Sequence, residues 1–198
     1  MQFDFYFDVG SPNAYLSHTV IPQIEKRTNT TCRYIPILLG GVFKATNNRS
    51  PMEAFAGIDN KLSYIRLETE RFMSRYNVKG FQRNPHFPVN TLMMMRGAIY
   101  AETQPFFDKY VDVTMRAMWQ EQRKMDEFDV FKETLVQNDL PADEIIQATQ
   151  DQNVKKRLIE NVDHAVALGI FGSPSFIVNG ELYFGKDTLP TVEEILSK

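Results

Sequence analysis

The sequence predicts an α/β protein in which a β-α-β unit and a β-β-α unit flank a long helical block. Apolar residues alternate at the start of the chain, recur every three or four residues through its middle, and surround an Asn-Gly turn near its end. With 198 residues, the chain is long enough to bury a sizeable core. We therefore expect either one compact domain or one domain that carries a large insertion, in preference to two independent domains.

The β-α-β unit opens with phenylalanines at alternate positions over residues 3–7, which is the period of a strand with one buried face. A Gly-Ser-Pro sequence ends this strand. Residues 13–24 are expected to form a helix, with Ser11 as its cap and Pro12 at its first position, where the missing N–H costs nothing. Residues 31–35 form the second predicted strand.

The middle of the chain is predicted to be helical from about residue 52 to residue 168. Residues 40–41 and 46–51 are rich in Gly, Asn and Ser and are expected to be loops. The candidate helices cover 90–102, 106–119, 128–137, a short segment opened by Pro141, and 154–168. Three methionines, Met93 to Met95, fit either an adaptable ligand wall or core filling, and we favour the core.

The C-terminal unit begins with two short apolar runs, 175–178 and 181–184. They are joined by Asn179-Gly180, the strongest short signal for a hairpin. A last helix is expected over 189–198, with a proline near its start.

The composition excludes several functional classes. The formal charge of −3 arises from 22 basic and 25 acidic residues without long single-sign blocks, so nucleic acid and anionic membranes are not expected partners. No apolar run reaches the length of a membrane span. Cys32 is the only cysteine, which excludes an internal disulfide and gives no metal-ligand spacing. We expect a cytoplasmic protein that acts on small molecules.

Ser11 marks the first candidate site, because a strand ends and a helix begins there. Backbone N–H groups and the positive end of the helix dipole converge at such a point and stabilise a bound anion, of which a thiolate is one example. Taken alone, a serine before a proline is more often a simple helix cap.

Pro174 marks the second candidate site, at the entrance of the first strand of the hairpin. Proline cannot donate a hydrogen bond to a neighbouring strand, so a strand entrance is a permitted position, and a cis peptide after Ser173 is compatible with it. Base rates alone favour a trans bond. The context of the whole chain reverses that preference.

Three segments carry a family resemblance: residues 5–16 (FYFDVGSPNAYL), 171–176 (FGSPSF) and 180–189 (GELYFGKDTL). The chain resembles the thioredoxin superfamily in its DsbA-like form and, within it, the group of 2-hydroxychromene-2-carboxylate isomerases and kappa-class glutathione transferases. The resemblance implies a thioredoxin-like domain formed by residues 1–45 and 166–198, with a helical insertion domain over 46–165.

The resemblance also implies a glutathione site without redox-active cysteines. The family's usual cysteine pair falls at Ser11 and Ala14, which cannot form a disulfide, so the chain is not expected to be a dithiol oxidase. In the similar enzymes the serine hydrogen-bonds the sulfur of bound glutathione, which makes Ser11 the implied catalytic residue. Pro174 is implied to follow a cis peptide, and Ser173 to pair its backbone with the cysteinyl unit.

The implied glutathione-binding residues are Ser11, Asn48, Ser173, Gly185, Lys186, Asp187 and Thr188. Asp187 is expected to pair with the γ-glutamyl ammonium. Thr188 and local N–H groups are expected to bind the γ-glutamyl carboxylate. Both residues are also compatible with a cap for the last helix. Lys44 lies near the position of a substrate-contacting lysine, and an ordinary solvated lysine fits this position equally well. No metal site is expected.

The implied activity is glutathione-dependent isomerisation. A thiolate that adds to a double bond makes it a rotatable single bond until the thiolate is expelled, which splits one difficult step into two easier ones. The expected substrate is an aromatic or chromene-like acid, bound against Met, Phe and Tyr of the insertion. Residues 83–90, which include His86, do not settle its identity. A kappa-like transferase and a non-catalytic peptide-binding scaffold are the alternatives, and a homodimer is compatible with the resemblance.

Overall fold

The computed structural model describes residues 2–198, which form a four-stranded sheet and ten α-helices. The strands are β1 (Gln2–Phe7), β2 (Thr31–Pro36), β3 (Ser175–Val178) and β4 (Glu181–Phe184). The helices are α1 (Pro12–Thr28), α2 (Leu39–Ala45), α3 (Pro51–Ala54), α4 (Lys61–Tyr76), α5 (Leu92–Ala101), α6 (Phe107–Trp119), α7 (Phe128–Gln137), α8 (Ala142–Ala148), α9 (Gln152–Ala167) and α10 (Leu189–Leu196), with a short 3-10 turn, η1 (Lys186–Thr188). The predicted order of units is confirmed.

The sheet is mixed and has the order β2-β1-β3-β4. The central strand β1 runs parallel to β2 and antiparallel to β3. It buries Phe3, Phe5 and Phe7, as the alternating pattern predicts. Asn179 and Gly180 both have positive φ, which suits the tight turn that joins β3 to β4. The carboxyl end of β1 therefore lies between two neighbouring strands, and the loop to α1 starts there.

Helices α5 and α6 share their core with the sheet. One hydrophobic cluster contains Phe5 of β1, Met95 of α5 and Trp119 of α6. The indole nitrogen of Trp119 also donates a hydrogen bond to the Val9 carbonyl at 2.7 Å, which ties α6 to the loop after β1. Met94 and Met95 are fully buried, so the prediction that they fill the core is confirmed for these two, whereas Met93 is half-buried at the edge of the cluster.

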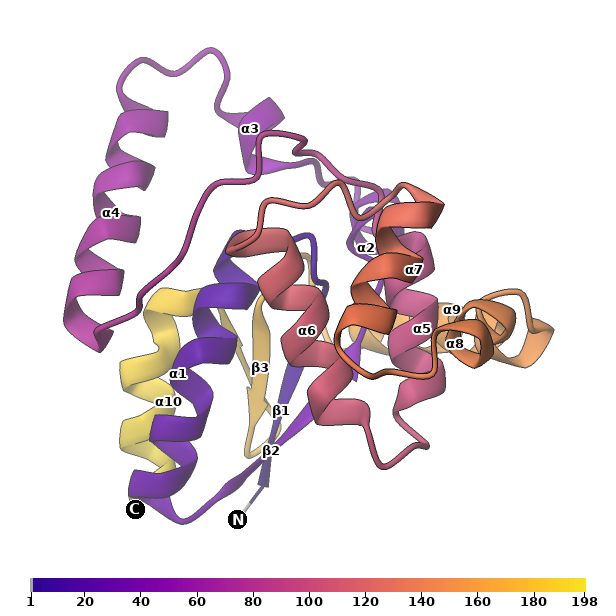
Figure 1. The fold of residues 1–198 in the computed structure, drawn as a ribbon. Helices are drawn as coiled ribbons and strands as arrows, with labels where there is room; N and C mark the ends of the chain where they lie inside the picture. Colours follow the sequence, from indigo (N-terminus) through magenta and orange to yellow (C-terminus); the bar gives the residue numbers. More distant parts are fainter. Residues whose placement is uncertain (1) are drawn as a thin grey trace.

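Figure 1 shows α1 and α10 on one side of the molecule, α5 to α9 grouped on the other, and α4 apart from that group on the side of α10. The expected loop at Gly40 and Gly41 was wrong, because both residues lie inside α2. The helix begins where the Leu39 N–H donates to the Asp8 carboxylate at 2.8 Å. This contact joins residues far apart in the sequence, so local composition does not indicate it.

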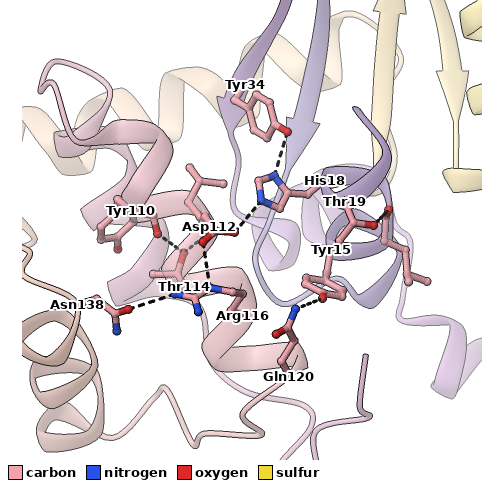
Figure 2. A network of polar contacts seen from close by, with 12 residues as sticks. Tyr15, His18, Thr19, Tyr34, Tyr110, Asp112, Thr114, Arg116, Gln120 and Asn138 are labelled. Atoms are coloured by element: carbon pink, nitrogen blue, oxygen red, sulfur yellow. Dashed lines mark hydrogen bonds and ion pairs between the residues drawn. The ribbon is translucent and has the colours of Figure 1, made fainter. Parts of the chain in front are cut away.

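A polar network joins α1 and β2 to the helical segments (Figure 2). Nδ1 of His18 lies 2.9 Å from the Tyr34 hydroxyl, and its Nε2 lies 3.6 Å from the Asp112 carboxylate on α6. Asp112 accepts a hydrogen bond from Arg116 at 2.9 Å. Arg116 in turn donates to Asn138 at 3.1 Å, just after α7. His18 therefore has a structural role, because both of its ring nitrogens face partners that join α1 to β2 and α6.

Acid is expected to remove the contribution of Asp112 to stability. His18 and the Arg116 guanidinium hold the pKa of the Asp112 carboxyl below its usual range. A carboxyl with a lowered folded-state pKa stabilises the protein above its unfolded pKa of about 3.9, and this contribution is lost as the pH falls through the folded value. Because the side chain is half exposed, Asp112→Asn is expected to lower the free energy of unfolding by less than about 1 kcal/mol at neutral pH.

Urea unfolding of both proteins at neutral pH and at about pH 3 checks this expectation, provided that both remain folded in acid. The difference between them should shrink in acid. A difference that stays constant or grows would show that the charge of Asp112 does not matter to the network.

Candidate active site

Ser11 lies at the N-cap of α1, as predicted. Its hydroxyl oxygen accepts a hydrogen bond from the Ala14 N–H at 3.2 Å, so it does cap the helix. The same hydroxyl donates to the Ser173 carbonyl at 2.9 Å. The side chain is buried. It therefore connects the positive end of α1 to the entrance of β3, and its single proton is held by Ser173.

The Ser173–Pro174 peptide bond is cis, the isomer that the resemblance implies. The Ser173 hydroxyl bridges the Asp8 N–H and the Tyr6 carbonyl, at 3.2 and 3.4 Å. Among residues 2–198, the Ser173 backbone N–H has no hydrogen-bond acceptor. The Pro174 carbonyl accepts from the Gly185 N–H at 2.9 Å, which joins the entrance of β3 to the turn after β4.

Asn48 also reaches the loop before β3. Its side-chain amide donates to the Phe171 carbonyl at 2.8 Å. Lys44 is exposed on α2, and the structure shows no hydrogen bond or ion pair that links it to the other candidate residues. The structure therefore brings Asn48 close to the Ser173 loop, whereas Lys44 stays an unpaired surface lysine within the described residues.

Two exposed aromatic rings flank the Ser173 loop. Phe171 and Phe184 are 40% and 43% exposed, and their ring centroids lie 4.4 Å apart. Gly172 lies beneath this pair: a Cβ atom there would come within 2.8 Å of the Phe184 ring. Glycine is thus the residue that lets the Phe184 ring approach the backbone of the loop.

The turn after β4 contains an ion pair between adjacent residues. The Lys186 ammonium, only 3% exposed as a residue, contacts both carboxylate oxygens of Asp187 at 2.6 and 2.7 Å. It also lies 5.0 Å from the centre of the Phe72 ring. Thr188 occupies the N-cap position of α10, but its side chain makes no capping hydrogen bond there.

Asp8 was missed as a site residue. Its buried carboxylate accepts hydrogen bonds from the Gly10 N–H, the Leu39 N–H and the Thr91 hydroxyl, at 2.8, 2.8 and 3.0 Å. Burial raises the pKa of the Asp8 carboxyl, although all three donors favour its charged form. Asp8 holds together the Ser11 loop and the starts of α2 and α5. The signal for it was an acid directly after an apolar strand.

Cys32 is not part of this site. It is buried on β2, and burial raises the pKa of its thiol well above the usual value, so little reactive thiolate forms. We expect Cys32→Ser to keep the activity of the wild type, and the wild type to lack insulin-reducing activity. Parallel assays of the two proteins check both points. Loss of activity in Cys32→Ser would contradict the assignment of Ser11 as the catalytic residue.

Within residues 2–198, no cluster of three or more His, Cys, Asp or Glu side chains is arranged to hold a metal ion. No described helix combines the length and apolarity needed to cross a membrane.

Residues 2–197 match the family model of the DSBA-like thioredoxin domain, and the chain belongs to this family. The predicted thioredoxin-like fold is thereby confirmed. The chain is 27% identical to glutathione S-transferase kappa 1 of Caenorhabditis elegans, over 98% of this chain and 90% of that protein. It is 26% identical to 2-hydroxychromene-2-carboxylate isomerase of Pseudomonas putida, over 98% and 94%.

A solved structure of 2-hydroxychromene-2-carboxylate isomerase superposes with a TM-score of 0.84 at 24% identity, covering 98% of this chain and 93% of that one. Together with the family model and the named relatives, this confirms the resemblance to the group that the sequence indicated.

Proposed function

We propose that the protein is a glutathione-dependent isomerase of the 2-hydroxychromene-2-carboxylate type. The observation that carries the proposal is the contact between the Ser11 hydroxyl and the Ser173 carbonyl. It places a hydrogen-bond donor, a helix N-terminus and the entrance of a strand beside one another. Relatives named as isomerases and as kappa transferases support the enzyme class.

The residues at this point fit glutathione. An extended tripeptide pairs with backbone groups, and Ser173 offers an N–H without a partner next to a carbonyl that only a side chain occupies. The Asp187 carboxylate, 65% exposed, is open to a ligand ammonium on the side away from Lys186. Asn48 keeps the preceding loop in place through Phe171. We expect Asn48, Gly185 and Lys186 to border the tripeptide.

Ser11 is proposed to exchange one hydrogen-bond partner for another. A ligand N–H that takes over the Ser173 carbonyl frees the Ser11 proton to point at the sulfur. Such a charge-assisted hydrogen bond contributes about 1.5–3 kcal/mol, and the start of α1 adds about 0.3–1 kcal/mol. Together they are enough to lower the pKa of a thiol from about 8.5 by roughly two units. Bound glutathione supplies a thiolate that adds reversibly to a double bond.

An aromatic acid is the proposed substrate class. Phe171 and Phe184 present exposed rings beside the Ser173 loop, and an aromatic substrate packs well against such faces. We expect Lys44 to meet the substrate carboxylate. We also expect the enzyme to act in the cytoplasm, where glutathione is kept reduced.

The fate of the thiol separates the isomerase from the transferase. The protein is incubated with 2-hydroxychromene-2-carboxylate and substoichiometric glutathione, while NMR follows the isomers and a thiol assay follows free glutathione. We expect complete isomerisation with the thiol content unchanged. Loss of thiol in proportion to substrate favours the kappa-like alternative. If the protein catalyses neither reaction, the result supports the non-catalytic scaffold.

A further inference from the structure

Thr188 lacks the free donors that its expected role requires. Its hydroxyl donates to the Gly185 carbonyl at 2.8 Å, and its backbone N–H donates to the same oxygen at 3.1 Å. The following N–H, of Leu189, donates to the Lys186 carbonyl. Thr188 itself therefore offers no free donor to a γ-glutamyl carboxylate bound at this turn.

A hollow of about 400 Å³ opens beside this turn, between η1 and α4. Its lining residues are Tyr64, Glu68, Arg71, Phe72, Arg75 and Asp187. The buried Lys186 ammonium lies against the Phe72 ring and pairs with Asp187, so it ties the two walls together. One wall of the hollow is α4, which Figure 1 shows outside the group formed by α5 to α9.

The hollow contains two arginines and two acids, Glu68 and Asp187, so it offers partners for both charges of an amino acid end group. Arg71 and Arg75 lie four positions apart on α4, on one face of the helix, and within residues 2–198 neither has an ion-pair or hydrogen-bond partner. Asp187 lies on the opposite wall. The α-carbon of a γ-glutamyl group carries both an ammonium and a carboxylate, which need an acid on one side and cations on the other.

We propose that Arg71 and Arg75 bind the α-carboxylate of the γ-glutamyl group while Asp187 binds its ammonium. This inference rests on the proposed function and assigns to α4 a part of the glutathione site. The guanidinium fork of arginine matches the geometry of a carboxylate, which makes it suited to this contact.

Calorimetric titration with two ligands tests the proposal. One is glutathione, and the other is 4-aminobutanoyl-cysteinyl-glycine, which differs from glutathione only in lacking the α-carboxylate. The variant is Arg71→Ala combined with Arg75→Ala, and the matched control is Arg66→Ala, an exposed arginine of α4 outside the hollow. We expect the double variant to bind glutathione at least about tenfold more weakly and the analogue unchanged. Arg66→Ala should bind both ligands like the wild type.

The outcomes separate this inference from the proposed function. Wild-type protein that binds neither ligand would overturn both. If the wild type and the double variant bind glutathione with the same affinity, the arginines have no role, and the proposed function still stands. An equal loss of affinity for both ligands would also overturn it, because that loss does not depend on the carboxylate. Thermal unfolding of each variant verifies that it is folded.

Discussion

Ser11→Ala is expected to raise the pKa of the glutathione thiol in the complex by about one to two units, because one hydrogen bond to the thiolate is lost. Turnover at neutral pH should fall roughly tenfold to a hundredfold, since the thiolate fraction falls with the shift, and should partly recover as the pH rises. Binding should weaken little, because the backbone of Ser173 and the carboxylate of Asp187 remain. The ultraviolet absorbance of the thiolate, measured against pH, gives the pKa directly.

Ser17→Ala is the matched control for this experiment. Ser17 is buried on the same helix, and its hydroxyl donates to the Asn13 carbonyl, away from the Ser173 loop. The Ser17→Ala substitution should therefore leave the pKa of the glutathione thiol unchanged. Loss of the Ser11 cap itself costs about 1 kcal/mol of stability, so both variants are compared only where they are fully folded. Superimposable titration curves for wild type and Ser11→Ala would reduce Ser11 to a helix cap.

Asp8→Asn is expected to lower the free energy of unfolding by about 2–4 kcal/mol at neutral pH. The two carboxylate oxygens accept hydrogen bonds from Gly10, Leu39 and Thr91, and an amide has only one acceptor oxygen. In either orientation, its NH₂ group faces a partly buried backbone N–H, of Gly10 or of Leu39, which is left without an acceptor. The loop that carries Ser11 loses an anchor as well, so glutathione affinity should fall. Urea unfolding and calorimetry measure the two effects.

Asp4→Asn is the matched control on the same strand. Asp4 pairs with Arg33 near the surface, and losing such a pair costs less than about 1 kcal/mol. The comparison therefore separates a structural role inside the site from the removal of any acid on β1. Equal losses of stability in Asp4→Asn and Asp8→Asn would contradict the anchoring role of Asp8.

Local patterns predicted the elements that hold the site. The alternation in β1, the Asn-Gly turn between β3 and β4, and the cap at Ser11 depend on neighbouring residues, and the structure confirms each of them. The features that were missed depend on contacts across the chain. Asp8 reaches the starts of α2 and α5. One local contact was missed as well: Thr188 uses its donors on Gly185, three residues earlier, which no property of a single residue indicates.

We propose that glutathione binds as a thiolate at the contact between Ser11 and Ser173. Calorimetric titration in buffers of different ionisation enthalpy tests it most directly, because the dependence on the buffer counts the protons released on binding. Wild-type protein should bind glutathione near neutral pH with release of a proton, whereas S-methylglutathione, which has no thiol proton, should release none. Absence of glutathione binding, or binding without a difference in proton release between the two ligands, would contradict the claim.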